Sequence, residues 1–366
     1  MIASERKFRF CEPDNESEKH FMNIGLLPLE HHHRLLKIAG ETPACRWDGS
    51  ESPAAWRARA KETLSDLLGI PEIEKHRTVP VMQVELNRVD EEIGCREIRF
   101  RFVTEEQVTV PCHLLIPKDA HGPLPVVLCL QGHSKGMHIS LGRPKYPGDE
   151  ETCHGGDRDF AVRAVKEGIC AVAIEQRCFG ECGGTEKGPD CRQAAMRAIL
   201  LGRTLIGERV WDISRCIDVL CERFTDYIDP NRVMCMGNSG GGTATIYAAA
   251  MDERIKIAIP SCAVCTYADS IGAMLHCECN FVPGGVKAFD MGDLCAMTAP
   301  RSLVVVSGAR DPIFPLDGAK ACVALGQKMY DALGVPDAIA HVVGDGEHRF
   351  YANDAWPVIH RMPDTL

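Results

Sequence analysis

An apolar run ends abruptly in the segment Val233-Met234-Cys235-Met236-Gly237-Asn238-Ser239-Gly240-Gly241-Gly242, where a lone serine is surrounded by glycines. A helix-like segment, 243–251, follows directly. The pattern Gly-x-Ser-x-Gly at such a junction predicts a strand, a tight turn and a helix, with the serine hydroxyl raised above the strand ends. Glycine is needed at 237 and 241 because so tight a turn leaves no room for side chains. We therefore expect a nucleophile elbow, with the helix start offering N–H groups to an oxyanion.

A glycine-rich turn between strand and helix can also hold a phosphate group. A dinucleotide site needs Gly-x-Gly-x-x-Gly and an acidic residue about 20 residues further on, at the end of the next strand. Here the next predicted strand, 255–259, ends in Pro260-Ser261 without a carboxylate. The serine hydrolase interpretation is favoured, but this motif alone leaves a nucleotide site or a structural turn open.

The composition is that of an ordinary globular protein and excludes several classes of partner. The chain has 366 residues, of which 45% are hydrophobic, and its net charge of −10 argues against nucleic acid. No apolar run approaches the roughly 18 residues of a membrane helix, and the N-terminus lacks an apolar signal region. The 19 cysteines are therefore expected to be thiols in a reducing cytoplasm rather than a disulfide framework.

Hydrophobic periodicity divides the chain into two parts. Residues 1–78 are expected to form a helical extension packed on the main domain, with helices over 16–38 and 54–68. Residues 79–366 are expected to form an α/β domain with a mostly parallel central sheet, antiparallel N-terminal strands and helices on both faces. The predicted strands are 82–87, 96–103, 108–116, 126–130, 169–175, 233–237, 255–259, 303–307 and 338–343, and the predicted helices are 157–167, 193–205, 210–224, 243–251 and 316–333. An irregular insertion, 262–299, is expected near the active site.

Serine needs a base, and the base needs an orienting acid. Asp311 follows the strand 303–307, and His348 follows the strand 338–343 in a glycine-rich loop. The order serine, acid, histidine, each after a strand end, is typical of this kind of hydrolase. Asp317 and Asp345 are alternatives for the acid, and His133 and His276 are alternatives for the base. The two oxyanion donors are expected to be the amides of Gly240 and His133, the latter from the loop after the strand 126–130.

Six motifs are typical of one known group of enzymes: Gln131-Gly132-His133, Glu175-Gln176-Arg177-Cys178-Phe179-Gly180, Gly237-Asn238-Ser239-Gly240-Gly241, His276 to Gly284, Arg310-Asp311-Pro312-Ile313-Phe314-Pro315 and Gly346-Glu347-His348. With these motifs the chain resembles, over residues 108–362, the α/β-hydrolase superfamily and, within it, dienelactone-hydrolase-like and acetyl-xylan-esterase-like bacterial esterases. The resemblance implies an α/β-hydrolase fold and a cofactor-free serine carboxylesterase that cleaves short acyl esters, acetyl esters of sugars among them, through an acyl-enzyme. Two departures matter: dienelactone hydrolases use a cysteine nucleophile, and secreted xylan-deacetylating members carry a signal peptide, so small imported esters are favoured over polymeric xylan.

Five further residues are candidates for substrate binding. Lys135 and His138, in the predicted oxyanion loop, are placed near the leaving group, and His276 is placed in the insertion that lines or roofs the acyl pocket. Glu175 and Arg177 either contact substrate or pair with each other, and we favour the pair.

A zinc site built from Cys262, Cys265, His276, Cys277 and Cys279 is a weaker alternative, because these residues lie at irregular spacing in the insertion. We predict no metal. The predicted partner is a small-molecule ester, without nucleic acid or membrane, and a homo-oligomer is left open. The alternative functions are a prolyl-oligopeptidase-like aminopeptidase, a catalytically idle binding protein and a nucleotide-dependent hydride-transfer enzyme.

Overall fold

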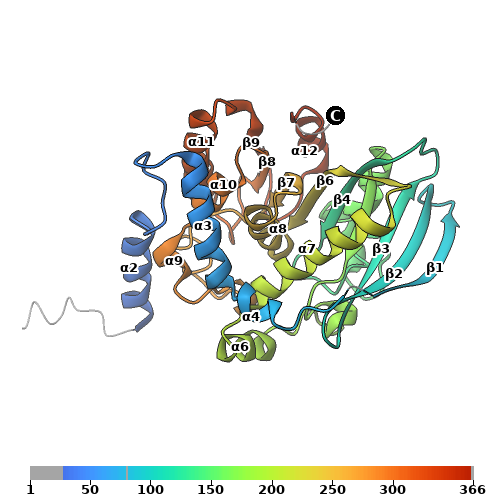
Figure 1. Cartoon of the computed structure of the whole chain (residues 1–366), viewed down its shortest axis with the longest axis horizontal. Coiled ribbons are helices and arrows are strands. Elements are labelled where there is room, and N and C mark those ends of the chain that lie inside the picture. The colour runs from blue at the N-terminus through green and yellow to red at the C-terminus, as the bar shows by residue number, and fades with distance from the viewer. Residues whose placement is uncertain (1–27, 80, 364–366) are drawn as a thin grey trace, which may run out of the picture.

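One nine-stranded sheet runs through the molecule in the order β1-β2-β3-β5-β4-β6-β7-β8-β9 (Figure 1). We describe a computed structural model, which covers residues 28–79 and 81–363. The first three strands pair antiparallel, β3 is also antiparallel to β5, and the pairs from β5 to β9 are parallel, as expected from the sequence. The strands are β1 (Met82–Asp90), β2 (Cys95–Glu105), β3 (Val108–Pro117), β4 (Leu124–Leu130), β5 (Cys170–Ile174), β6 (Ile228–Asn238), β7 (Ile255–Ser261), β8 (Ser302–Gly308) and β9 (Ile339–Gly344).

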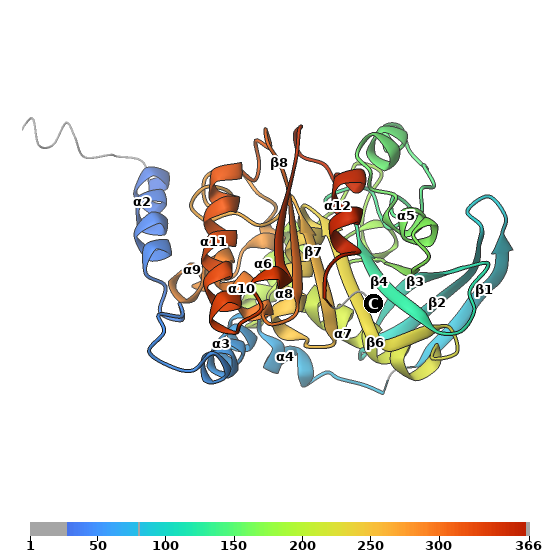
Figure 2. The ribbon, with the colours of Figure 1, turned by 90° about the horizontal axis from the view of Figure 1, so that it is seen from above.

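Helices cover both faces of the sheet (Figure 2). Successive residues of a strand point to opposite faces, so β4 sends Val126, Leu128 and Leu130 into one core and Val127 and Cys129 into the other. The first core is closed by α3, α7, α8, α10 and α11, and the second by α5 and α12. The helices are α2 (Pro28–Glu41), α3 (Pro53–Leu68), α4 (Ile70–Glu74), α5 (Phe160–Lys166), α6 (Arg192–Leu200), α7 (Leu205–Arg223), α8 (Gly240–Met251), α9 (Gly285–Ala288), α10 (Met291–Thr298), α11 (Leu316–Ala332) and α12 (Ala352–Ile359).

The predicted helix 54–68 is confirmed by α3. Ser52 caps its start by accepting from the Ala55 N–H (3.3 Å), and Gly69 ends it with a φ of 76°. Its apolar stripe, including Trp56, is buried in the larger core. Helix α2 has no buried residue and lies at the end of the molecule opposite β1 (Figures 1 and 2). The first half of the predicted helix 16–38 falls outside the described residues, and the domain boundary at residue 78 stays a prediction.

Two expectations about helices were wrong. The segment 262–299 is not irregular throughout, because α9 and α10 lie within it. The Asp290 side chain accepts from backbone N–H groups at the start of α10, and the Asp293 side chain accepts from the Asp290 N–H (2.7 Å). These reciprocal hydrogen bonds form a capping box. The second error is a boundary: Leu205 begins α7 rather than ending the preceding helix, because Thr204 caps α7 by accepting from the Gly207 N–H (3.0 Å).

The 18 cysteines in the described part of the chain are all free thiols. All of these except Cys182, Cys221 and Cys277 are buried. Across residues 28–79 and 81–363, no helix combines the length and the apolar character needed to cross a membrane.

Candidate active site

Ser239 lies at the junction between β6 and α8, with a φ of 56° and a ψ of −124°. The positive φ is rare for a residue with a side chain and costs about 1–3 kcal/mol. Its glycine neighbours are sterically required: a Cβ on Gly237 would lie 2.5 Å from the Gly241 carbonyl carbon, and one on Gly241 would lie 2.1 Å from the Leu130 oxygen. The Ser239 N–H donates to the Ser261 carbonyl (2.8 Å), which ties the turn to β7. The predicted strand, tight turn and helix are therefore present.

His348 and Asp311 are in direct contact. His348 Nδ1 and Asp311 Oδ2 are 2.8 Å apart, and Asp311 Oδ1 accepts the N–H groups of Ile313 (2.8 Å) and Phe314 (3.1 Å). Burial alone would raise the pKa of the Asp311 carboxyl, but the His348 ring and these hydrogen bonds hold that pKa below its ordinary value. Asp311 is thus an ionised, preorganised partner for the imidazole. It follows β8, His348 follows β9 and Ser239 follows β6, so all three lie at the carboxyl edge of the parallel strands.

The alternative acids do not reach His348. The Asp345 side chain is 91% exposed and pairs with Arg310 (2.6 Å), and Asp317 is fully exposed 3.9 Å from Lys320. Cys262 does reach the pair, since its sulfur lies within 4.8 Å of the ligand atoms of both Asp311 and His348. Burial raises the pKa of the Cys262 thiol to about 12, so the thiol stays protonated.

The loop after β4 passes directly over the elbow. A Cβ on Gly132 would lie 2.7 Å from the Asn238 oxygen, so glycine permits this close approach. The His133 ring packs on Gly240, where an added Cβ would be 2.5 Å from the ring Cε1. Gly240 is the first residue of α8, and the first N–H groups of a helix have no intrahelical partner. The two predicted oxyanion donors are therefore neighbours beside Ser239, and their role stays a prediction.

The Glu175 side chain binds the loop that follows β4. Its carboxylate accepts from Gln131 Nε2 (2.6 Å), the Met137 N–H (3.0 Å) and the Glu181 N–H (3.2 Å), while Gln176 Nε2 donates to the Gln131 oxygen (2.6 Å). Burial raises the pKa of Glu175 from 4.5 to about 7. Glu175 thus binds both ends of the loop from Gln131 to Met137.

We expect Glu175→Gln to change the pH dependence of stability. Burial raises the pKa of Glu175 in the folded chain, so between pH 4.5 and about 7 the folded state binds more protons than the unfolded state. The free energy of unfolding of the wild type therefore falls as the pH rises through that window. In urea unfolding at pH 5 and pH 8, the variant should lose less stability than the wild type, by up to about 3 kcal/mol. If the free energy of unfolding changed between pH 5 and pH 8 by the same amount in the variant and the wild type, the raised pKa of Glu175 would be contradicted.

The favoured pairing of Glu175 with Arg177 is wrong. Arg177 instead binds Asp212 (2.7 Å), Glu105 (2.6 Å) and Glu208 (3.2 Å). Strand β5 ends at Ile174, so the rule that residues i and i+2 share a face does not extend to this loop. Arg177 is thereby engaged in a buried ion network that joins β2 to α7.

Lys135 and His138 both contact Asp149, at 3.1 and 2.8 Å. Together with Glu175 they line a cavity of about 430 Å³ beside the oxyanion loop. Their predicted contact with a leaving group is untested by this geometry and stays a prediction.

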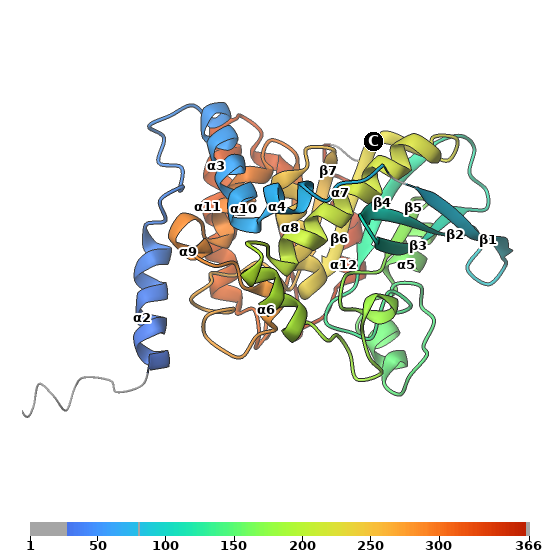
Figure 3. The ribbon, with the colours of Figure 1, turned by 60° about the horizontal axis from the view of Figure 1, so that its bottom comes forward.

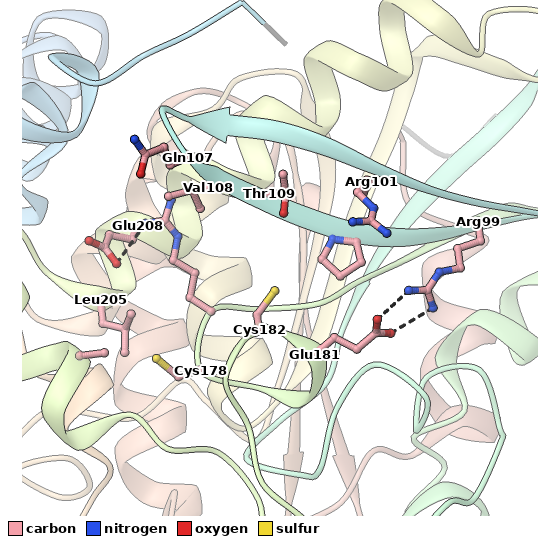
Figure 4. Close-up of a pocket in the computed structure, with 13 residues that line it drawn as sticks. Arg99, Arg101, Gln107, Val108, Thr109, Cys178, Glu181, Cys182, Leu205 and Glu208 are labelled. Carbon is pink, nitrogen blue, oxygen red and sulfur yellow. Dashed lines mark hydrogen bonds and ion pairs between the residues drawn. The ribbon is translucent and has the colours of Figure 1, made fainter. Parts of the chain in front are cut away.

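Figure 4 shows a larger cavity, of about 510 Å³, whose lining does not include the elbow. It is bounded by β2, β3 and the segment 177–182, and it contains the ion pair of Arg99 with Glu181 (2.6 Å). Ser239, Asp311 and His348 do not line it. We therefore do not assign the reaction to the larger cavity.

His276 reaches the Asp311–His348 pair through an aromatic side chain. Its ring meets Phe314 edge-on at 5.5 Å, and Phe314 stacks on His348 at 5.9 Å. Burial, followed by the neighbouring His133 and His348 rings, lowers the pKa of His276, which favours a neutral imidazole. This arrangement is consistent with the expectation that the insertion lies near the active site.

The cysteines considered for zinc fall into separate groups. Cys262 lies beside Asp311, and Cys265 donates to the Pro315 oxygen (3.6 Å). Cys277 and Cys279 instead meet His133 and Cys191. The sequence did not indicate Cys191 as a member of this cluster, because it lies 58 positions after His133 and 86 positions before Cys277.

Comparison with known proteins gives a consistent family. A family model described as "Abhydrolase family" matches residues 34–328. "Putative hydrolase YtaP" of Bacillus subtilis (strain 168) is 25% identical over 215 residues, which span 57% of this chain and 67% of that protein. "4-O-methyl-glucuronoyl methylesterase 1" of Wolfiporia cocos (strain MD-104) is 26% identical over 183 residues, 43% of this chain and 42% of that enzyme.

Two solved structures share the fold. A "putative acetyl xylan esterase" from Bacteroides fragilis NCTC 9343 matches with a TM-score of 0.71 and 20% identity, over 87% of this chain and 83% of its own. A glucuronoyl esterase from Solibacter usitatus matches with a TM-score of 0.57 and 17% identity, over 80% of this chain and 92% of its own. These matches confirm the resemblance to α/β hydrolases and to acetyl xylan esterases in fold. The likeness to dienelactone hydrolases stays a prediction.

Proposed function

Because the chain belongs to the Abhydrolase family, we propose that it is a serine carboxylesterase that hydrolyses short acyl esters, acetyl esters of sugars in particular. The observation that carries the proposal is the contact of buried Asp311 with His348 (2.8 Å) at the same sheet edge as Ser239 in its positive-φ turn. Three of the four similar proteins are named as a putative acetyl xylan esterase, a glucuronoyl esterase and a glucuronoyl methylesterase, and these names support a sugar ester as substrate.

The first chemical step forms an acyl-enzyme. Ser239 Oγ attacks the ester carbonyl while His348 Nε2 takes its proton. Asp311 fixes the tautomer by accepting from Nδ1 and stabilises the imidazolium. The amides of Gly240 and His133 receive the oxyanion, and one such donor is worth about 10²–10³ in turnover.

The first step is completed when the ester C–O bond breaks and His348 gives its proton to the departing alcohol. In the second step His348 takes a proton from a water molecule that attacks the acyl-serine, and the proton returns to Ser239 Oγ as the acid is released. The Phe314 ring stacks on His348, and the His276 ring packs edge-on against Phe314. We propose that these rings limit the space for the acyl group, which supports a preference for acetate.

The two kinds of relative differ in which side of the ester carries the sugar. In a sugar acetate the sugar is the alcohol, whereas in a glucuronoyl methyl ester the sugar is the acid. The test therefore compares p-nitrophenyl acetate, butyrate and octanoate, and then a peracetylated xyloside with methyl glucuronate. We expect activity to peak at acetate and the acetylated xyloside to be the faster sugar substrate.

Other outcomes distinguish the alternatives. Faster cleavage of methyl glucuronate would contradict the acetyl preference but not the esterase class. Cleavage of aminoacyl p-nitroanilides without ester hydrolysis would favour the aminopeptidase alternative. Turnover of no substrate by a folded chain would favour an idle binding protein.

A further inference from the structure

Four potential metal ligands from three distant segments meet beside the elbow. The sulfur atoms of Cys191, Cys277 and Cys279 and a ring nitrogen of His133 all lie within 4.8 Å of one another. Cys191 immediately precedes α6, while Cys277 and Cys279 belong to the short turn around Glu278–Asn280. His133 is in the loop after β4, and its Nε2 is 3.1 Å from the Cys279 sulfur.

We propose that Cys191, Cys277, Cys279 and His133 bind one zinc ion. Three thiolates and one imidazole form a common tetrahedral set for structural zinc. With Zn–S bonds of about 2.3 Å and Zn–N bonds of about 2.0 Å, neighbouring ligand atoms lie roughly 3.5–3.8 Å apart. The limit of 4.8 Å for all pairs and the 3.1 Å contact of His133 with Cys279 bracket that spacing, so shifts of about 1 Å suffice.

Arg209 supplies the charge that such a site requires. Its side chain is fully buried and donates to the sulfur atoms of Cys279 (3.2 Å) and Cys191 (3.3 Å). It also donates to the Arg177 oxygen (2.9 Å) and lies over the Phe179 ring at 4.4 Å. Among the described residues its guanidinium donates to these two sulfur atoms and to one backbone oxygen, so its charge faces sulfur. Zinc with three thiolates carries a net charge of −1, which the guanidinium neutralises, and N–H groups that donate to ligand atoms orient them.

The surrounding fold holds the ligands in place. Cys191 and Cys279 are buried in a small apolar cluster with Phe179, Ala195 and Leu205. An ion pair of Arg192 with Glu278 (3.0 Å) joins α6 to the turn that carries Cys277 and Cys279. Figure 3 shows α6 beside the segment that precedes α9. The zinc ion would thus join the loop over the elbow, α6 and the insertion, a positioning role outside the ester chemistry.

The test measures metal binding directly and does not depend on ester hydrolysis. The full chain is purified under reducing conditions, stripped with a chelator, titrated with Co²⁺ and, separately, with Zn²⁺, and analysed for metal after gel filtration. We expect one zinc per chain, and with cobalt a thiolate charge-transfer band and the intense visible bands of a tetrahedral complex.

Cys277→Ser is the informative variant because Cys277 is only half-buried and its replacement leaves the core intact. It should weaken cobalt binding by more than about 100-fold, beyond the effect of losing an outer-shell partner. Cys221→Ser is the matched control, since Cys221 is also half-buried but lies in α7 outside the cluster. Wild-type chain that binds no stoichiometric cobalt while its thiols are reduced would overturn the proposal, as would Cys277→Ser binding cobalt like the wild type.

Discussion

Replacing Ser239 with alanine is expected to lower kcat for p-nitrophenyl acetate by roughly 10⁴- to 10⁶-fold. The proposed acyl-enzyme cannot form without the hydroxyl, and the activity left after loss of such a nucleophile comes from the oxyanion hole and substrate binding alone. The measurement is the initial rate at saturating ester, with the concentration of folded enzyme checked by circular dichroism. Since the turn is built by Gly237, Gly241 and the Ser239 backbone, the variant should fold normally.

The matched control is Ser140→Ala. The Ser140 hydroxyl is buried and has no hydrogen-bond partner among the described residues, so its removal should leave turnover within about twofold. A Ser239→Ala enzyme that keeps a tenth or more of the wild-type kcat would exclude Ser239 as the nucleophile.

Asp311→Asn should reduce kcat by about 10⁴-fold while the fold is retained. An asparagine oxygen can still accept the Ile313 and Phe314 N–H groups, but the amide no longer holds His348 in the tautomer that accepts a proton from serine. Substrate binding is not expected to change, so KM should stay within about threefold. The comparison variant is Asp345→Asn, whose exposed carboxylate lies three positions before His348 and binds only Arg310 among the described residues.

Asp311→Asn should also change how the stability of the fold depends on acidic pH. Because the pKa of Asp311 is lowered in the folded chain, the unfolded state takes up the proton first, and the carboxylate stabilises the fold at neutral pH. That contribution is lost as the pH falls below 3.8 through the lowered pKa, so the wild type should lose more stability than Asp311→Asn over this range.

In the activity measurement, equal kcat values of Asp311→Asn and Asp345→Asn would refute Asp311 as the acid that orients His348.

Local patterns were enough to predict the sheet and the elbow. Strand β2 was predictable because apolar and polar residues alternate along a strand that is buried on one face. Strand β4 was predictable because a strand buried on both faces forms a short run of apolar residues. The turn at Ser239 is fixed by adjacent glycines that no other residue could replace. The contact between Asp311 and His348 was predictable because parallel strands bring their carboxyl ends to one edge.

Contacts that depend on the packing of distant elements left no such trace. Arg177 meets Glu105 and Asp212, residues of β2 and α7, and nothing near Arg177 in the sequence indicates either partner. Helix α10 was missed for a different reason: its eight residues are all buried, so it lacks the polar face that makes a helix recognisable. The Asp290–Asp293 cap was its one local signal.

The cluster around Cys279 combines both difficulties. Its ligands come from the loop after β4, the start of α6 and the insertion, and only the folded sheet brings these segments together. The short spacing Cys277-x-Cys279 was visible, but the sequence offered Cys262 and Cys265 as equally plausible partners.

The many thiols in the interior tie the chemical lifetime of the protein to its fold. While the chain is folded, burial raises the pKa of many of these thiols, and it raises the pKa of Cys170 and Cys235 to about 12, which keeps them protonated and unreactive. An unfolded chain exposes all of them to oxidation and mutual exchange. Each opening then risks crosslinks that block refolding, so without a reductant the heat tolerance of this protein becomes a matter of rate, set by how often the chain opens rather than by an equilibrium midpoint.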